Sequence, residues 1–298
     1  MKLKIDISQF RVPADSKKNV PLVKRPTGVP ILYKDKSHYG ELIDQFRSEI
    51  DELQEMMYAQ DRYGMLLIFQ AMDAGGKDST IKHVLRGVNP HGIHIHSFKK
   101  PTQNELDHDF MWRTSKCLPA RGRIGIFNRS YYEEVLICKV NPNIITDYQR
   151  LPKESTKDMK KLFQKRYEDI RNLESYCHAN GIRIAKFFLH VSKDEQKKRF
   201  LRRIDRPEKN WKFNEADVAE RKHWDAYMAA YDEAISTTST SDCPWYVIPA
   251  DDKKNMRLLV SKAVLTEMQR MHLHYPKLPE GQMHVLERCR EALMNEDG

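Results

Sequence analysis

The chain has 298 residues, of which 40% are hydrophobic and 31% are charged, and its net charge is +9. This composition excludes a disordered chain, and no apolar run approaches the roughly 18 residues of a membrane-spanning helix. The N-terminus has no apolar run of signal-peptide length, and the five cysteines are scattered without a CxxC pair, so we expect a reduced, cytoplasmic protein. The basic excess predicts a polyanionic partner such as nucleic acid, nucleotide, polyphosphate or an anionic membrane surface.

Short apolar runs alternate with helical patterns along the chain. Residues 1–36 carry four prolines among lysines, which predicts an irregular arm, and apolar residues at helical spacing then predict a helix over 38–60. The strands that the sequence predicts are 65–69, 93–98, 123–127, 182–191 and 245–248. The further predicted helices are 80–85, 102–117, 155–180, one opened by Ser192, 214–236 and one from about residue 255.

Five short apolar strands separated by helices predict an α/β fold, with a five-stranded parallel sheet and helices on both faces. No shift in composition divides the chain, so we expect one domain with a basic insertion at about 203–222. Ligands of open α/β sheets bind beyond the carboxyl ends of the strands. Motifs that directly follow predicted strands are therefore the first places to look for a site.

The segment Q-A-M-D-A-G-G-K-D-S-T at 70–80 directly follows the first predicted strand. Its adjacent glycines let the backbone approach an anion, and the helix start that follows offers free N–H groups. The pattern G-x-x-x-x-G-K-[ST] is matched in part: Gly76 and Lys77 fit, but Ala71 and Asp78 replace the first Gly and the Ser/Thr. We interpret the segment as a phosphate-binding loop; the alternative is a glycine turn with a solvated lysine.

Two acidic residues of this loop are candidate metal ligands. Without the usual Ser/Thr hydroxyl, Asp73 or Asp78 would hold Mg²⁺, which prefers oxygen ligands. His91, His94 and His96 resemble a metal cluster, but no cysteine or well-placed acid completes a zinc site. The sequence therefore favours magnesium over zinc.

A second motif, N-R-S-Y-Y-E, follows the third predicted strand. Asn128 stands where P-loop proteins carry an acid beside the phosphates, and Arg129 is suited to binding phosphate through its fork of N–H groups. Glu133 has two interpretations. It is an active-site acid, or it completes a helix capping box with Ser130.

A run of basic residues follows the fourth predicted strand, within and beyond a helix that Pro207 interrupts. Such a run is commonly a solvated face, but beside a phosphate loop it is suited to closing over phosphates as a lid. Four more basic residues would extend a positive channel along the same sheet edge: Lys99, Lys100, Arg113 and Arg121. No helix-turn-helix, zinc-finger or RNA-binding signature is present, so we expect no nucleic-acid partner.

A series of ordered sequence blocks resembles the polyphosphate kinase 2 family. The blocks include F-Q-A-M-D-A-G-G-K-D-S-T-I-K-H-V, G-V-N-P-H-G, S-F-K-K-P-T, G-I-F-N-R-S-Y-Y-E-E-V-L, N-W-K-F and P-W-Y-V-I-P-A-D-D-K, and run from about residue 40 to residue 272. The resemblance implies a three-layer P-loop kinase fold of the thymidylate-kinase type with a helical lid. It also implies Mg²⁺-dependent, reversible transfer of the terminal phosphoryl of inorganic polyphosphate to ADP and AMP.

The same resemblance implies roles for individual residues. Asp73 and Lys77 match the first phosphate-binding motif, and Asn128, Arg129 and Glu133 match the second. We predict catalytic roles for Asp73, Lys77, Arg129 and Glu133, with Asp73 holding Mg²⁺. The predicted phosphate and polyphosphate contacts are Gly75, Gly76, Lys77, Asp78, Ser79, Thr80, Arg129, Arg203, Lys209 and Lys212. The predicted nucleotide contacts are Asn128, Arg113 and Lys99.

The N-R-S form with Glu133 is most similar to the class III branch of the family, which is taken to phosphorylate both AMP and ADP. The family also suggests homo-oligomers, commonly tetramers. The alternative enzyme is an ATP-dependent nucleotide kinase of the thymidylate-kinase type. The alternative of another class is a non-catalytic P-loop or nucleic-acid-binding protein, and a GTPase would need an N-K-x-D motif that this chain lacks.

These predictions divide the chain into three parts. An N-terminal arm covers 1–36, a P-loop kinase domain covers 37–275 with its lid at about 203–222, and a C-terminal tail covers 276–298. The expected partners are inorganic polyphosphate and the adenine nucleotides AMP, ADP and ATP, with no membrane partner.

Overall fold

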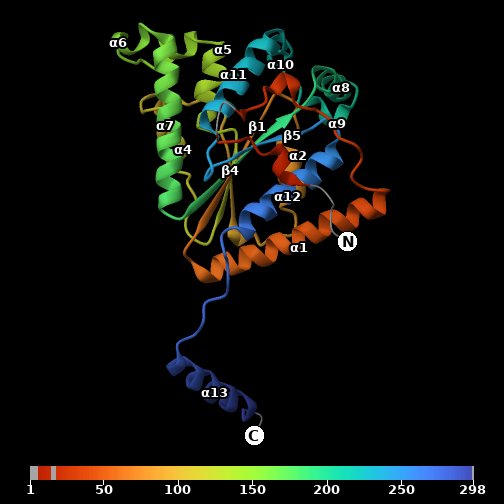
Figure 1. The fold of residues 1–298 in the computed structure, drawn as a ribbon, viewed down its shortest axis with the longest axis vertical. Helices are drawn as coiled ribbons and strands as arrows, with labels where there is room; N and C mark the ends of the chain where they lie inside the picture. Colours follow the sequence, from red (N-terminus) through yellow and green to blue (C-terminus); the bar gives the residue numbers. More distant parts are fainter. Residues whose placement is uncertain (1–5, 15–17, 297–298) are drawn as a thin grey trace.

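A single parallel sheet of five strands lies at the centre of the computed structural model, which describes residues 6–14 and 18–296 (Figure 1). The strands are β1 (Gly64–Ala71), β2 (Ile93–Ser97), β3 (Ile124–Asn128), β4 (Ile182–His190) and β5 (Trp245–Pro249). They lie in the order β2-β3-β1-β4-β5. All eight residues of β1 are buried, as expected of the central strand in a sheet covered on both faces.

Helices cover both faces of this sheet. The main helices are α1 (Lys36–Gln60), α2 (Lys77–Val84), α7 (Met159–Ala179), α8 (Lys193–Ile204), α11 (Trp224–Thr238) and α12 (Lys253–Gln269). Figure 1 shows α1 and α12 together on one side of the sheet and α7 with α11 on the other. The predicted three-layer α/β architecture is therefore confirmed.

Shorter helical segments connect these elements, and a last helix follows them. The short α-helices are α3 (Gln103–Leu106), α4 (Trp112–Ser115), α5 (Ile137–Val140), α6 (Lys153–Thr156), α9 (Pro207–Asn210) and α10 (Glu215–Glu220). Short 3-10 segments lie at Ile7–Phe10, Leu22–Lys24, Pro90–Gly92, Tyr131–Val135 and Arg221–His223, and a π-helical segment lies at Ile144–Tyr148. Helix α13 (Glu280–Met294) lies within the expected C-terminal tail and stands away from the sheet (Figure 1).

The predicted continuous helix over 102–117 is wrong. Its capping box is present, since the Thr102 hydroxyl accepts from Glu105 N and the Glu105 carboxylate accepts from Thr102 N. The helix nevertheless ends after one turn, and Asp109 then accepts a hydrogen bond from Met111 N at 2.9 Å. Such a side-chain bond to the nearby backbone competes with the helical ladder, so α3 and α4 remain separate turns.

Two other predicted helices are also divided. The long helix over 155–180 begins later than expected, because Asp158 caps α7 by accepting from Lys161 N at 3.0 Å. It ends where expected, before Gly181, which has φ +85°. The predicted helix over 214–236 consists of α10, a 3-10 turn and α11.

The N-terminal arm packs along the β5 edge of the sheet. Val12 N donates to Trp245 O at 2.8 Å, and the arm contributes buried Ile7, Phe10 and Leu22 to the core. The arm is irregular, as predicted, apart from its short 3-10 turns; residues 1–5 and 15–17 of the expected arm, and 297–298 of the tail, lie outside the described residues. Within the described part of the chain, no helix is long and apolar enough to cross a membrane.

Candidate active site

The loop between β1 and α2 has the tight shape that its glycines require. Gly76 has φ +105° and Ala74 has φ +58°, both in the left-handed region. A Cβ on Gly75 would lie 2.5 Å from Ala71 Cβ and 2.7 Å from Met72 O. Only glycine fits at position 75, so the loop backbone curls closely over the end of β1.

Arg199 of α8 holds this loop in place from behind. Its Nη1 donates to Gly75 O at 2.9 Å and to Ala74 O at 3.2 Å. Its Nη2 donates to Ala250 O, beyond β5, and its Nε donates to the Glu195 carboxylate at 2.9 Å. The guanidinium is buried and fully engaged. Arg199 belongs to the basic run that the sequence analysis interprets as a lid, but it acts as a structural brace between the loop and β5.

We expect Arg199→Gln to remove this brace. Several buried carbonyls would lose their charged donor, so the free energy of unfolding should fall by about 3 kcal/mol or more. Chemical denaturation measures this change. Arg202→Lys, on the exposed side of the same helix, is the matched control and should leave stability within about 0.5 kcal/mol. Equal stability of the Arg199 variant and the control would show that the brace contributes nothing.

Charged side chains of opposite sign meet above the loop. Arg129 Nη2 lies 3.1 Å from Asp73 Oδ1, and Lys77 Nζ donates to Ala71 O at 3.0 Å. Burial and the neighbouring Arg129 charge lower the pKa of Lys77, opposed by the carboxylates of Asp73 and Glu133. The Glu133 carboxylate raises the pKa of Arg129. Arg129 itself has φ +64°, a strained backbone conformation that tertiary contacts must maintain.

Glu133 belongs to this charged cluster and does not form a capping box with Ser130. With the Gln70 amide nitrogen facing it, Glu133 Oε1 accepts at 2.9 Å, while the Gln70 oxygen accepts from Ser130 N at 3.2 Å. Burial raises the pKa of Glu133, and the charges of Arg129 and Lys77 oppose that rise. The capping interpretation is therefore wrong, and Glu133 is placed to hold Arg129.

The start of α2 is ordered by side chains that the sequence singles out. Asp78 Oδ1 accepts from Asn128 Nδ2 at 2.7 Å, which joins the two predicted motifs. The hydroxyls of Ser79 and Thr80 both donate to Gly76 O, at 3.2 and 2.9 Å. Thr80 is fully buried, so its side chain holds the turn and does not face the cleft.

A cleft of about 920 Å³ opens above the loop. Ten lysines and arginines but only three aspartates line it. Of the predicted site residues, the cleft brings together Asp73, Gly75, Gly76, Lys77, Asp78, Ser79, Lys99, Asn128, Arg129, Arg203, Lys209 and Lys212. Three predicted residues do not line it, namely Thr80, Arg113 and Glu133. Glu133 lines a small adjoining cavity of about 50 Å³, together with Asp73 and Arg129.

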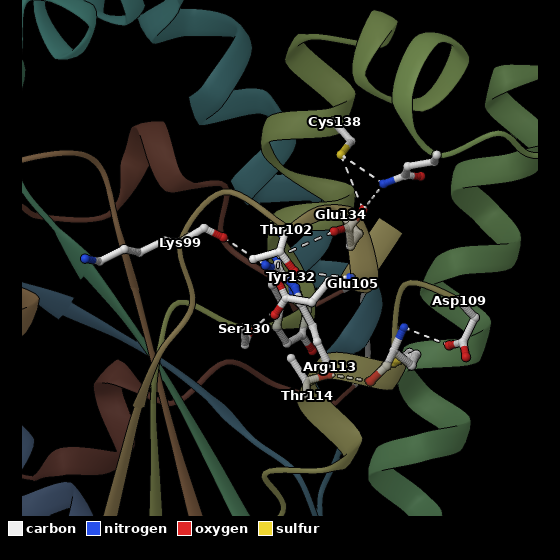
Figure 2. A network of polar contacts seen from close by, with 12 residues as sticks. Lys99, Thr102, Glu105, Asp109, Arg113, Thr114, Ser130, Tyr132, Glu134 and Cys138 are labelled. Carbon is white, nitrogen blue, oxygen red and sulfur yellow. Dashed lines mark hydrogen bonds and ion pairs between the residues drawn. The ribbon is translucent and has the colours of Figure 1, made fainter. Parts of the chain in front are cut away.

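Arg113 is a correction to the predicted nucleotide contacts. It is buried, donates to Lys99 O at 2.8 Å and lies 3.8 Å from the Glu134 carboxylate. Figure 2 shows the Lys99 side chain directed away from this network while its carbonyl faces Arg113. Arg113 thus fixes the backbone from which Lys99 reaches the cleft.

Arg121 is a second correction, since it cannot extend a positive channel at the site. Its Nη1 donates to Arg62 O at 3.0 Å and to Asn180 O at 3.1 Å. Both carbonyls precede strands, so Arg121 lies at the amino ends of β1 and β4. The phosphate loop lies at the opposite, carboxyl end of these strands. Arg121 stands just before the third predicted strand, whereas Arg129 stands just after it. This difference in position is the sequence signal that distinguishes a site residue from one at the far end of the sheet.

The predicted lid is a helical excursion over the cleft. Arg203, Lys209 and Lys212 line the cleft, and α10 contributes Asp217, which lies 3.6 Å from Arg203 Nη1. Burial and the nearby Asp73 carboxylate raise the pKa of Asp217. The lid therefore brings a carboxylate as well as positive charges to the loop.

Several residues that line the cleft were not predicted from the sequence. They are Lys82, Ile95, Phe98, Trp211, Asp217 and Lys253. Lys253 follows the fifth predicted strand in D-D-K, so the rule that ligands bind beyond strand ends would have found it. Trp211 lies at the lid and is 78% exposed, which is unusual for the largest apolar side chain.

Comparison with known proteins agrees with this geometry. The family described as polyphosphate kinase 2 (PPK2) matches residues 33–276. An ADP-polyphosphate phosphotransferase of Rhodopseudomonas palustris is 51% identical over 98% of this chain and 100% of its own length. An AMP/ADP-polyphosphate phosphotransferase of Meiothermus ruber is 41% identical over 80% of this chain and 84% of its own.

A solved structure shows the same likeness in three dimensions. The crystal structure of polyphosphate kinase 2 from Arthrobacter aurescens TC1 superposes with a TM-score of 0.84 at 34% sequence identity. The match covers 96% of this chain and 98% of that chain. With the family match and these relatives, the chain belongs to the polyphosphate kinase 2 family.

Proposed function

We propose that this protein transfers the terminal phosphoryl group of inorganic polyphosphate to ADP and AMP in an Mg²⁺-dependent, reversible reaction. With ADP, the products are ATP and a polyphosphate chain one unit shorter. The observation that carries this proposal is the braced phosphate loop at the base of a cleft lined by ten basic side chains. The names of the two relatives, ADP-polyphosphate and AMP/ADP-polyphosphate phosphotransferase, support the substrates.

The residues supply positions and charge, while the reacting oxygens belong to the substrates. An oxygen of the acceptor's terminal phosphate attacks the end phosphorus of polyphosphate, and the bond to the bridging oxygen breaks in line. Lys77 and the backbone N–H groups at the start of α2 hold phosphate oxygens. Arg129 neutralises the charge that develops on the transferred group, and Glu133 positions Arg129.

Asp73 is the proposed magnesium ligand. Among residues 6–14 and 18–296, no group of three or more His, Cys, Asp or Glu side chains is arranged to hold a metal. Mg²⁺ does not need such a group, because it is commonly held by one or two carboxylates together with substrate phosphates and water. Asp73 fits this requirement, since its carboxylate is partly exposed in the cleft beside Lys77. The bound ion would neutralise phosphate charge.

The two substrates are proposed to approach from different parts of the cleft. Asn128 ends β3 and Lys99 follows β2, beside the apolar side chains of Ile95 and Phe98, and this part suits a nucleotide. Arg203, Lys209 and Lys212 of the lid grip the polyphosphate chain. Lid closure would exclude water from the transfer.

An ATP-dependent nucleotide kinase is not favoured. Such an enzyme needs a site for the adenosine of its donor as well as for its acceptor. The cleft instead carries ten basic side chains, and relatives across most of the chain have polyphosphate in their names.

One assay tests the proposal. The protein is mixed with long-chain polyphosphate, Mg²⁺ and either ADP or AMP, and the nucleotides are separated by chromatography. We expect ATP from ADP, ADP from AMP, and loss of both products with EDTA. Asp73→Asn should raise the Mg²⁺ concentration for half-maximal rate by about tenfold or more. Transfer from ATP but not from polyphosphate would overturn the proposed donor. Transfer to ADP but not to AMP would exclude AMP as an acceptor.

We further propose a cytoplasmic homo-oligomer. All five cysteines lie in the described part of the chain and are free thiols, which supports a reducing compartment. Size-exclusion chromatography with light scattering would test the homo-oligomer, for which the family resemblance suggests a tetramer.

A further inference from the structure

Lys253 stands on the β5 side of the cleft, held by a well-anchored backbone. It is the first residue of α12, directly after the cap Asp252, which accepts from Asn255 N at 2.7 Å. The preceding residues are tied to the end of β4 and to the start of α8. Ala250 N donates to His190 O at 2.9 Å, and Asp251 Oδ1 accepts from Ser192 N at 2.7 Å.

The first turn of α12 also touches the phosphate loop. The sulfur of Met256, one turn after Lys253, lies 3.7 Å from the Thr80 hydroxyl oxygen. Its Cε lies 3.2 Å from where a Gly76 Cβ would be. The N-terminal turns of α2 and α12 therefore lie side by side, and Lys253 lines the same cleft as Lys77. Helix N-termini favour anions, which adds to the positive charge here.

Lys253 has no role in holding the protein together that would account for its position. No hydrogen bond or ion pair of its ammonium group is seen among the described residues. Its charged neighbours are mainly of the same sign: Arg199, Arg202 and Glu195 on α8, and Arg257 on α12. Lys77 and Lys82 of α2 line the same cleft. Burial and the positive charges of Arg199 and Arg202 lower the pKa of Lys253 to about 8. A half-buried ammonium group among like charges is a site for an anion.

We infer that Lys253, with the exposed side chains of Arg202 and Lys82 that line the same cleft, binds the polyphosphate chain behind the phosphoryl group that is transferred. This inference rests on the proposed polyphosphate activity and adds a subsite to it. The lid residues grip the chain from α9 and its flanks, whereas Lys253 contacts it from the fixed α12 side. The nucleotide, bound near β2 and β3, lies across the phosphate loop from this subsite.

A pH dependence follows from the same position. A polyanion binds the ammonium form of Lys253, so binding is strongest below pH 8 and weakens as the pH rises through about 8. Between pH 7.5 and 9, the KM for polyphosphate should rise by roughly fivefold as the free lysine loses its proton, because the neutral form still binds, as weakly as an alanine variant. The KM for ADP should not show this rise.

The experiment compares Lys253→Ala, Lys253→Arg and Lys254→Ala with the wild type. Lys254 is the matched control, because its ammonium group lies over the Tyr33 and Tyr39 rings, 4.8 and 5.3 Å from their centroids, and it does not line the cleft. Fluorescence anisotropy of end-labelled polyphosphate measures binding without turnover. Initial rates at pH 7.5 and 9 give the KM for each substrate, and thermal unfolding confirms that each variant is folded.

We expect Lys253→Ala to weaken polyphosphate binding and raise its KM about tenfold at pH 7.5, with kcat within about twofold and the KM for ADP unchanged. Lys253→Arg should bind normally and lose most of the rise at pH 9, because arginine stays charged. Lys77 is present in the wild type and in every variant. Any effect of its titration on the KM therefore cancels when the variants are compared with the wild type. Unchanged binding in Lys253→Ala, or a raised KM for ADP instead, would overturn the inference. If wild-type protein binds no polyphosphate, the proposed function itself fails, and this subsite fails with it.

Discussion

Replacing Lys77 by alanine should lower kcat/KM for polyphosphate by about a thousandfold and leave the fold intact. Lys77 is the one cationic side chain of the loop itself, and its ammonium group lies at the base of the cleft beside Asp73 and Arg129. Without it, the charge that develops on the transferred phosphoryl group loses its nearest fixed counter-charge. Arg199, not Lys77, braces the loop backbone, so the loop should keep its shape.

Steady-state rates with polyphosphate and ADP measure this loss, and thermal unfolding tests the fold. Lys77→Arg is the informative companion, because it keeps the charge but changes its position and shape. We expect it to recover only part of the rate. A Lys77→Ala variant that kept a tenth of the wild-type kcat/KM would show that the phosphate loop is not the centre of the reaction.

The second large effect concerns stability rather than rate. Lys186 of β4 is fully buried and forms an ion pair with Glu174 of α7. The Lys186 ammonium group also donates to Thr238 O at 2.8 Å, and Glu174 accepts from the Tyr131 and Tyr132 hydroxyls at 3.0 and 2.8 Å. Lys186→Met would leave the Glu174 carboxylate buried without its counter-charge. The free energy of unfolding should fall by about 3–5 kcal/mol.

The double variant Lys186→Met/Glu174→Gln provides the control. It removes both charges but retains an acceptor for the tyrosine hydroxyls, so most of the lost stability should return. Denaturant titration of the wild type, Lys186→Met, Glu174→Gln and the double variant gives the coupling energy between the two side chains. If Lys186→Met is no less stable than the double variant, the pair is not the source of the stabilisation.

The fold could be predicted from the sequence because its strands are unusually easy to recognise. Met65–Phe69 and Trp245–Ile248 are apolar runs that are too short to form helices. Such runs predict buried strands, and every residue of β1 and β5 is buried. Helix interruptions could not be predicted in the same way. Asp109 accepts a hydrogen bond from Met111 N between α3 and α4, and apolar periodicity carries no information about that bond.

The site shows the same division between pattern and tertiary context. Asp73, Lys77 and Arg129 directly follow strands, and parallel strands bring their carboxyl ends to one edge, so their meeting was predictable. Residue type alone could not separate Arg199, which braces the loop, from Arg203, which faces the cleft. Both arginines belong to α8, and only the packing of α8 against the phosphate loop buries Arg199.

The N-terminal arm has a consequence for the order in which the protein is made. Thr27 donates to the Asp251 carboxylate at 2.7 Å across 224 residues, and Leu32 N donates to Asn255 Oδ1 at 3.0 Å. The arm therefore finds its partners 223 and 224 residues later in the chain. Contacts of such long sequence separation form late in folding. The wall of the cleft that carries Lys253 is completed only after residue 255 has been synthesised, so a shorter nascent or truncated chain displays the phosphate loop without the full site.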